Sequence, residues 1–148
     1  MKDLPVARNR SVPINSVLPH VFYRNLEEAC EWLTRVFGFA EQYRYGEPVN
    51  GIQMRMEEAW IQLSKPGEHR ESPAILGRGT QMLTIILPDV EAHYRRSKAE
   101  GAKIWEELQE TCYGERQYGV EDIEGHRWLF SQHVRDVDPR EWGAKVKE

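Results

Sequence analysis

The chain has 148 residues, a hydrophobic fraction of 40% and a formal net charge of -4, which suits one compact domain or two small, interdependent modules. Its basic residues are scattered among acidic ones, which argues against nucleic-acid binding. No apolar run approaches the roughly 20 residues that span a bilayer, and the N-terminus lacks an apolar signal core. With 2 cysteines a disulfide framework is not expected. We therefore expect a cytoplasmic protein with reduced thiols and no membrane or nucleic-acid partner.

The first half of the chain is predicted to contain a strand, a helix and three more strands. A polar leader over residues 1–15 precedes a strand at residues 17–24. Asn25 followed by Glu28 is typical of a helix N-terminus, and Gly38 of a helix end. Apolar residues recur at helical spacing between these points. The three strands that follow are expected at residues 39–45, 51–57 and 59–64.

The second half repeats this order after a connector at residues 65–79, which contains two prolines and three glycines. A strand is expected at residues 81–87, a helix between Asp89 and Gly101, and a strand at 102–107. A hairpin follows within residues 113–130, with its turn at Asp122, Glu124 and Gly125. A charged tail at residues 135–148 is expected to hold a short helix after Asp138-Pro139, with Trp142 docking on the body or on a second subunit.

Each half therefore has the element order β-α-β-β-β, with the helix covering one face of its strands. We predict an α+β fold of two tandem βαβββ modules, at residues 16–64 and 80–134, that form a cleft between two curved mixed sheets. Because the two halves match in element order and not in residues, this internal repeat alone is modest support for a fold.

The motifs of both modules resemble a known superfamily. Residues 17–39, with a strand, an Asn cap, a helix and a Phe-Gly-Phe sequence, are similar to the opening βα unit of the vicinal oxygen chelate superfamily. The hairpin from Tyr113-Gly-Glu-Arg to Asp122-x-x-Gly-His-x-Trp resembles its glyoxalase/bleomycin-resistance branch in particular. The resemblance covers residues 16–134. It implies one domain in which two cup-shaped modules enclose a cleft, commonly within a homodimer.

The resemblance also implies where a metal would bind. Enzymes of the superfamily hold a divalent metal through His, Glu or Gln on the inward faces of equivalent strands, so that two substrate oxygens can chelate it. Carried over to this chain, the four ligand positions fall on Leu18, Gln62, Met82 and Leu129. Leucine cannot coordinate, a methionine thioether is too soft for a catalytic Mg, Mn or Zn site, and one glutamine cannot hold the ion alone. The sequence therefore favours a protein without the family metal and without another cofactor.

Two alternatives stay open. One is a divalent-metal-dependent lyase, isomerase or dioxygenase of the same superfamily, with His20, Gln62 and Glu57 as the residues to test. The other is a structural or regulatory protein whose cleft is filled by its own side chains. No Ser/His/Asp constellation and no phosphate-binding glycine loop is visible, so no catalytic residue is assigned.

Aromatic and methionine side chains make up much of the predicted ligand site, and such walls suit a planar or cationic molecule. His20 is read either as a hydrogen-bonding ligand contact or as a partly buried strand residue. Arg116 and Arg127 either clamp an anionic group or pair with neighbouring acids. We expect Trp60 in the core, His93 in solvent and His126 in a packing role. The predicted ligand-binding residues are Leu18, His20, Phe22, Met54, Gln62, Met82, Tyr113, Arg116, Tyr118, Arg127 and Leu129.

The function expected from these residues is the binding of a small organic molecule in an apolar cleft, at a dimer interface and without metal. Sequestration of a toxic compound is one purpose that fits, because it needs no chemistry from the missing metal ligands.

Overall fold

The computed structural model describes residues 17–147, so the predicted leader at residues 1–15 lies outside the described residues. It contains two four-stranded sheets, with strand orders β1-β4-β3-β2 and β5-β8-β7-β6. The β1/β4 and β5/β8 pairs are parallel and the other pairs are antiparallel, so both sheets are mixed. The predicted α+β class and the two tandem modules are confirmed. The strands are β1 (His20–Phe22), β2 (Ala40–Tyr45), β3 (Gly51–Met56), β4 (Ala59–Ser64), β5 (Met82–Ile86), β6 (Lys103–Glu110), β7 (Glu115–Glu121) and β8 (Arg127–His133).

One long helix per module covers its sheet. In the first module α1 (Leu26–Trp32) continues as a π-helical turn, η1 (Leu33–Phe37), and Gly38 ends it with a φ of 85°. The Asn25 side chain accepts a 3.1 Å hydrogen bond from the Glu28 amide, as its sequence position predicts. In the second module Asp89 caps α3 (Val90–Ala99) in the same way. Two short helices complete the chain, α2 (Pro73–Leu76) in the connector and η2 (Pro139–Trp142) in the tail.

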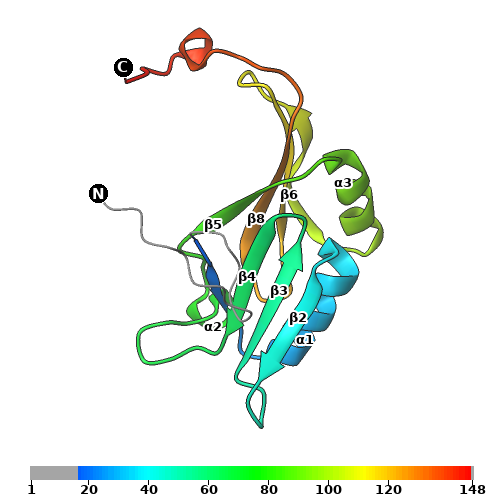
Figure 1. Cartoon of the computed structure of the whole chain (residues 1–148), viewed down its shortest axis with the longest axis vertical. Coiled ribbons are helices and arrows are strands. Elements are labelled where there is room, and N and C mark those ends of the chain that lie inside the picture. The colour runs from blue at the N-terminus through cyan, green and yellow to red at the C-terminus, as the bar shows by residue number, and fades with distance from the viewer. Residues whose placement is uncertain (1–16, 148) are drawn as a thin grey trace, which may run out of the picture.

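The helix-covered sides of the two sheets meet in a single core. Phe37, at the end of η1, contacts Trp128 and Phe130 of β8, with ring centroids 5.7 and 4.9 Å apart. All three side chains are fully buried. In Figure 1 α1 and α3 lie on the same side of the molecule, and the strands open toward the other side. Within residues 17–147, no further sheet or helix layer lies over the faces that point away from the helices (Figure 1).

The turn between β7 and β8 fixes the second module to the start of α1. The Glu124 carboxylate accepts hydrogen bonds from the backbone amides of Arg24, at 2.8 Å, and Asn25, at 3.1 Å. A negative charge is favourable at this end of a helix, where amides lack intrahelical partners. The Ser72 hydroxyl, which begins α2, donates to the same carboxylate at 2.5 Å. One glutamate thus joins both modules and the connector.

The other end of the same helix is held by α3. Arg96 donates hydrogen bonds to the carbonyl oxygens of Thr34, at 3.0 Å, and Arg35, at 3.1 Å. His93 donates from Nε2 to the carbonyl oxygen of Phe37 at 2.8 Å. Positive and donor groups are favourable at a helix C-terminus, which carries unpaired carbonyls. Because both ends of α1 are bonded to the second module, the two modules are held in one orientation.

The prediction that His93 faces solvent is wrong. Its ring lies 4.2 Å from that of Phe130, centroid to centroid, and its Nδ1 accepts a 2.5 Å hydrogen bond from the Tyr118 hydroxyl. Burial disfavours the charged imidazolium and lowers the pKa of His93 to about 4. The half-buried histidine is therefore neutral at neutral pH. The packing role expected for His126 is confirmed, because its ring contacts Tyr23 and its Nε2 hydrogen-bonds the Phe22 carbonyl at 2.7 Å.

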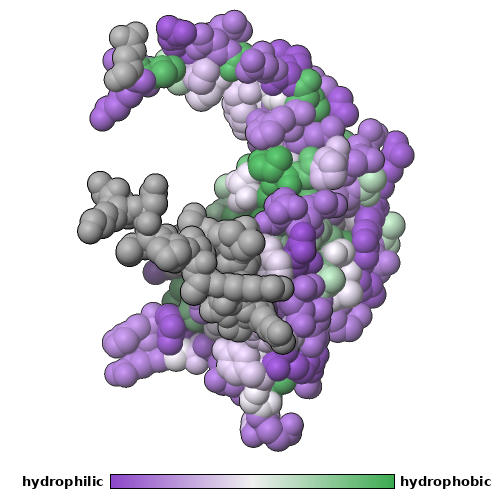
Figure 2. Space-filling model, viewed as in Figure 1, coloured by the Kyte–Doolittle hydropathy of each residue, from purple (hydrophilic) through white to green (hydrophobic). Residues whose placement is uncertain are grey.

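The chain beyond β8 extends away from the body as a C-terminal arm, residues 135–147, and arcs over the open side of the sheets (Figure 1). The predicted short helix of the tail is present as η2. Its Trp142 packs on Tyr113 of the same chain, with ring centroids 5.6 Å apart, and stays 43% exposed. Figure 2 shows hydrophobic residues gathered at the foot of this arm. No helix in the described part of the chain is long and apolar enough to cross a membrane.

Candidate functional site

We call the face of each sheet that points away from the helices its open face. The open face of the first sheet, β1-β4-β3-β2, carries a row of polar side chains. Strand register pairs His20 with Gln62, Gln62 with Gln53, and Gln53 with Tyr43. Since directly paired residues point to the same face, these four side chains form one line across all four strands. We call them the polar row. The Gln53 amide donates to the Tyr43 hydroxyl at 3.1 Å, and His20 Nδ1 lies 3.0 Å from the Ser64 hydroxyl.

Aromatic side chains flank the polar row on both sides. Phe22 lies two residues from His20 and carries the Arg70 guanidinium 5.2 Å above its ring. Trp60 lies two residues from Gln62, and Arg55 covers its ring at 5.2 Å. The prediction that Trp60 packs under the helix is therefore wrong, because residues two apart in a strand share a face. The first open face thus combines a row of hydrogen-bonding side chains with flat aromatic rings, each covered by a guanidinium group.

The open face of the second sheet is centred on Leu129 and Trp105. Leu129 pairs with Thr84 of β5 and Gly119 of β7. The Trp105 ring lies against Gly119 so closely that a Cβ there would be 2.5 Å from the ring. Only glycine leaves room for this flat packing. The Arg127 guanidinium lies 5.1 Å above the Trp105 ring and pairs with Glu121 at 3.7 Å.

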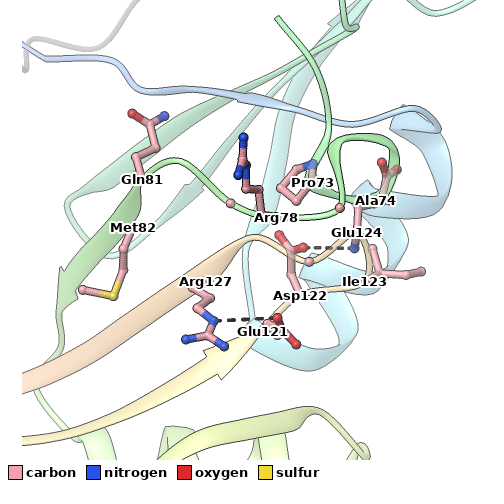
Figure 3. A pocket seen from close by; sticks show the side chains of 13 residues that line it. Pro73, Ala74, Arg78, Gln81, Met82, Glu121, Asp122, Ile123, Glu124 and Arg127 are labelled. Carbon is pink, nitrogen blue, oxygen red and sulfur yellow. Dashed lines mark hydrogen bonds and ion pairs between the residues drawn. The ribbon is translucent and has the colours of Figure 1, made fainter.

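A cavity of about 840 Å³ opens beside this second face, between the ends of the strands and the connector. Met82, Arg127 and Glu121 line it from the sheet, and Arg78 lines it from the connector. Figure 3 shows the Arg127–Glu121 pair at its base and the β7–β8 turn along one wall. Met82 and Arg127 are paired on the open face and also line the cavity, so the cavity adjoins this face. Its volume is in the range of small-molecule sites.

The structure places eight of the eleven predicted ligand-binding residues on or at the edge of the open faces. Leu18 lies just before β1 and is half-buried, and Tyr113 lies in the β6–β7 turn, where its hydroxyl donates to Gln117 at 3.1 Å. The eight are Leu18, His20, Phe22, Gln62, Met82, Tyr113, Arg127 and Leu129. They do not form one pocket within the chain, because they belong to two separate sheets.

Three predicted site residues lie on the opposite, helix-covered side. Met54 pairs with the core residue Ile61 and is fully buried. Tyr118 is also fully buried, and burial raises the pKa of its hydroxyl, which donates to His93. Arg116 has the strand parity of Tyr118 and forms an ion pair with Glu110 at 2.7 Å. Their residue types suit a ligand site, but strand alternation turns all three away from it.

Gln53 and Trp105 lie on the open faces and were not predicted as site residues. Gln53, at 2% exposure, lies in the polar row beside Tyr43. Trp105 lies on the second open face, where a β-bulge in β6 breaks the simple alternation. The sequence did contain a signal for Gln53. It is a polar residue between the apolar Ile52 and Met54, and such alternation indicates that its side chain points away from the core.

The resemblance assigns the family metal to four positions, which are Leu18, Gln62, Met82 and Leu129 in this chain. In this chain they supply one amide, from Gln62, and three apolar side chains, so the donors do not fit a hard divalent ion. Within residues 17–147, no group of three His, Cys, Asp or Glu side chains is arranged to hold a metal. Glu57, the carboxylate of the alternative ligand set, lies in the β3–β4 turn and not beside His20.

The comparisons with known proteins agree with this fold. Residues 14–130 match the Glyoxalase/Bleomycin resistance protein/Dioxygenase superfamily. The structure is similar to TioX from Micromonospora sp. ML1, with a TM-score of 0.68 and 28% identity over 84% of this chain and 100% of that one. It is also similar to TnmS3, an antibiotic binding protein from Streptomyces sp. CB03234, with a TM-score of 0.66 and 20% identity over 83% of this chain and 99% of that one.

The chain is also similar in sequence to a curated protein. An uncharacterized protein of Mycobacterium bovis is 25% identical over 138 residues, which cover 86% of this chain and 90% of the relative. The match to the superfamily spans both modules of the chain, from before β1 to the end of the aromatic run in β8. The chain therefore belongs to the glyoxalase/bleomycin resistance protein/dioxygenase superfamily.

Proposed function

We propose that this protein binds a planar, largely apolar small molecule in the cytoplasm, without the family metal, and sequesters it. The observation that carries the proposal is the composition of the open faces. Aromatic rings and uncharged hydrogen-bonding groups occupy the surface on which the family's enzymes would hold an ion. The description of the similar TnmS3 as an antibiotic binding protein supports a ligand of this kind.

The proposal includes a homodimer in which the open faces of two chains cover one another. Within residues 17–147 the helix-covered sides pack together, and no further sheet or helix layer lies over the open faces (Figure 1). Large apolar side chains on the edge strand of the second sheet are about half exposed, at 47% for Met82 and 47% for Ile86. Exposed apolar surface next to a cavity favours burial by a partner. A second copy would supply the missing wall and exclude water from the ligand.

A thermal-shift measurement tests the proposal. The probes are planar aromatic compounds of two to four fused rings, added in excess to purified protein. Binding to the folded state raises the midpoint of unfolding by mass action. We expect stabilisation of the wild type and of Ile75→Lys, whose apolar side chain is 53% exposed on α2. We expect Met82→Lys to lose the shift. The proposal would be contradicted by equal shifts in the two variants, or by the absence of a shift in the wild type.

A further inference from the structure

We propose that the polar row selects ligands by an uncharged hydrogen-bonding edge, such as amide or hydroxyl groups on a planar ring system. The inference rests on the proposed function and adds the chemical class of the ligand. The four side chains His20, Gln62, Gln53 and Tyr43 come from four adjacent strands. Since neighbouring strands are about 4.8 Å apart, the row spans about 14 Å, which is long enough to meet several groups along one edge of a fused-ring molecule.

Gln62 is the centre of this argument. Its side chain is 4% exposed, and its one hydrogen bond within the described residues runs from Nε2 to the Leu63 carbonyl at 3.5 Å, the long limit for such a bond. A glutamine amide offers two donors and one acceptor, so most of its capacity is unused. Buried amides are normally satisfied by protein, water or ligand. An uncharged group with both a donor and an acceptor is the complement that this side chain lacks.

The second open face holds another uncharged donor without a partner. The indole Nε1 of Trp105 is buried and makes no hydrogen bond within the described residues. Unsatisfied buried donors are rare in native structures and need a reason. In the proposed dimer a molecule held between the two open faces would meet the polar row on one side and Trp105 on the other. Both sides then favour neutral hydrogen-bonding groups over charged ones.

The charged side chains around the two open faces also favour a neutral ligand over a charged one. Arg127 is engaged by Glu121, and Arg55 donates to the Glu57 carbonyl oxygen at 2.7 Å. A ligand carboxylate beside Gln62 would therefore be desolvated without pairing to a free Arg55 or Arg127, which is costly. Arg70, which covers Phe22 at the β1 end of the row, is the position where an acidic ligand would bind instead. The two ligand classes thus depend on different residues.

Three matched probes separate these possibilities: 2-naphthamide, 2-naphthoate and unsubstituted naphthalene. Affinities are measured by chemical-shift titration of the full-length protein. We expect the wild type to bind the amide about tenfold more tightly than the carboxylate. Gln62→Met, which keeps the side-chain length but removes the amide, is expected to weaken binding of the amide about tenfold and to leave naphthalene unchanged. Gln109→Met, an exposed glutamine on β6, is the matched control and is expected to change neither.

The outcomes distinguish this inference from the function beneath it. Tighter binding of the carboxylate, lost in Arg70→Gln, would overturn the neutral-edge assignment while leaving small-molecule binding intact. Equal affinity for all three probes, or an equal loss of all three in Gln62→Met, would do the same. Failure of all three probes to bind would overturn both the inference and the proposed function.

Discussion

The hydroxyl group of Tyr23 donates a 2.6 Å hydrogen bond to the carboxylate of Asp122, and both side chains are buried. The bond joins the residue after β1 in the first module to the β7–β8 turn of the second. Asp122 also accepts from the indole of Trp128 at 3.0 Å. The hairpin that identifies the family in the sequence is therefore also the part that sets the relative orientation of the two sheets. Both open faces depend on it.

Removal of the Glu124 carboxylate tests the contribution of this turn. Glu124→Ala leaves the amides of Arg24 and Asn25 and the Ser72 hydroxyl without their acceptor. Unsatisfied buried donors cost on the order of 1–3 kcal/mol, so we expect the free energy of unfolding to fall by about 3 kcal/mol. Urea denaturation measures it. The exposed Glu68→Ala is the control and is expected to change stability by less than about 0.5 kcal/mol. A Glu124→Ala midpoint equal to the wild type would show that the turn does not stabilise the module pair.

His93 makes stability depend on pH. Burial lowers its pKa from 6.5 to about 4, so in this range the unfolded chain binds more protons than the folded one. The contribution of His93 is fully present above pH 6.5 and is lost as the pH falls from about 6.5 toward 4. At pH 5 we expect the free energy of unfolding to be about 2 kcal/mol lower than at pH 7 from this group.

Urea denaturation between pH 7 and pH 4.5 checks this dependence, and NMR titration of the His93 ring locates it. We expect the ring to stay neutral down to about pH 4 in the folded protein. Free histidine in the same buffer is the reference for an imidazole in solvent. A His93 ring that protonates together with free histidine would contradict the desolvated, hydrogen-bonded arrangement.

The two cysteines are expected to differ in reactivity. Cys30 is 5% exposed, and burial together with its contact to the Glu41 carboxylate raises the pKa of its thiol to about 11. Cys112 is exposed in the β6–β7 turn. Because the thiolate is the reactive form, a thiol-specific reagent should label one cysteine in the folded protein and both in urea. Mass mapping should assign the first label to Cys112, and rapid labelling of Cys30 in the native state would be inconsistent with its place in the core.

Ile86→Glu tests the proposed dimer. The change places a charge on the exposed edge strand of the second open face, where the proposed second copy packs. We expect a shift from dimer to monomer in light scattering after gel filtration, with the circular dichroism spectrum unchanged. Ile75→Glu, on α2, is the matched control and is expected to remain a dimer. A wild type that is monomeric at high concentration would rule out the two-chain cleft.

Much of the fold was predictable because it depends on local sequence features. Asn25 and Asp89 begin the helices, Gly38 ends the first one, and alternation in β8 puts Trp128 and Phe130 on one face. The predicted strand at residues 17–24 was too long because β1 contains three residues that pair with β4.

The site was predicted less well because it depends on register between strands. Met54 and Tyr118 have suitable chemistry for a cleft, but pairing with Ile61 and Phe130 turns them into the core. Trp60 is turned outward by the same rule. His93 was misplaced because its environment is built by Phe37, which lies 56 residues earlier in the chain. Contacts of this range leave no local pattern in the sequence.

Chelation tests the central claim most directly, that the cleft binds a small molecule without a divalent metal. The affinity for 2-naphthamide is measured before and after exhaustive dialysis against a chelator, and again after addition of Mg²⁺, Mn²⁺, Ni²⁺ or Zn²⁺. Because Leu18, Met82 and Leu129 supply no ligand atoms for a hard ion, we predict the same affinity within twofold in every condition. Binding that disappears on chelation and returns with one of these metals would contradict the account.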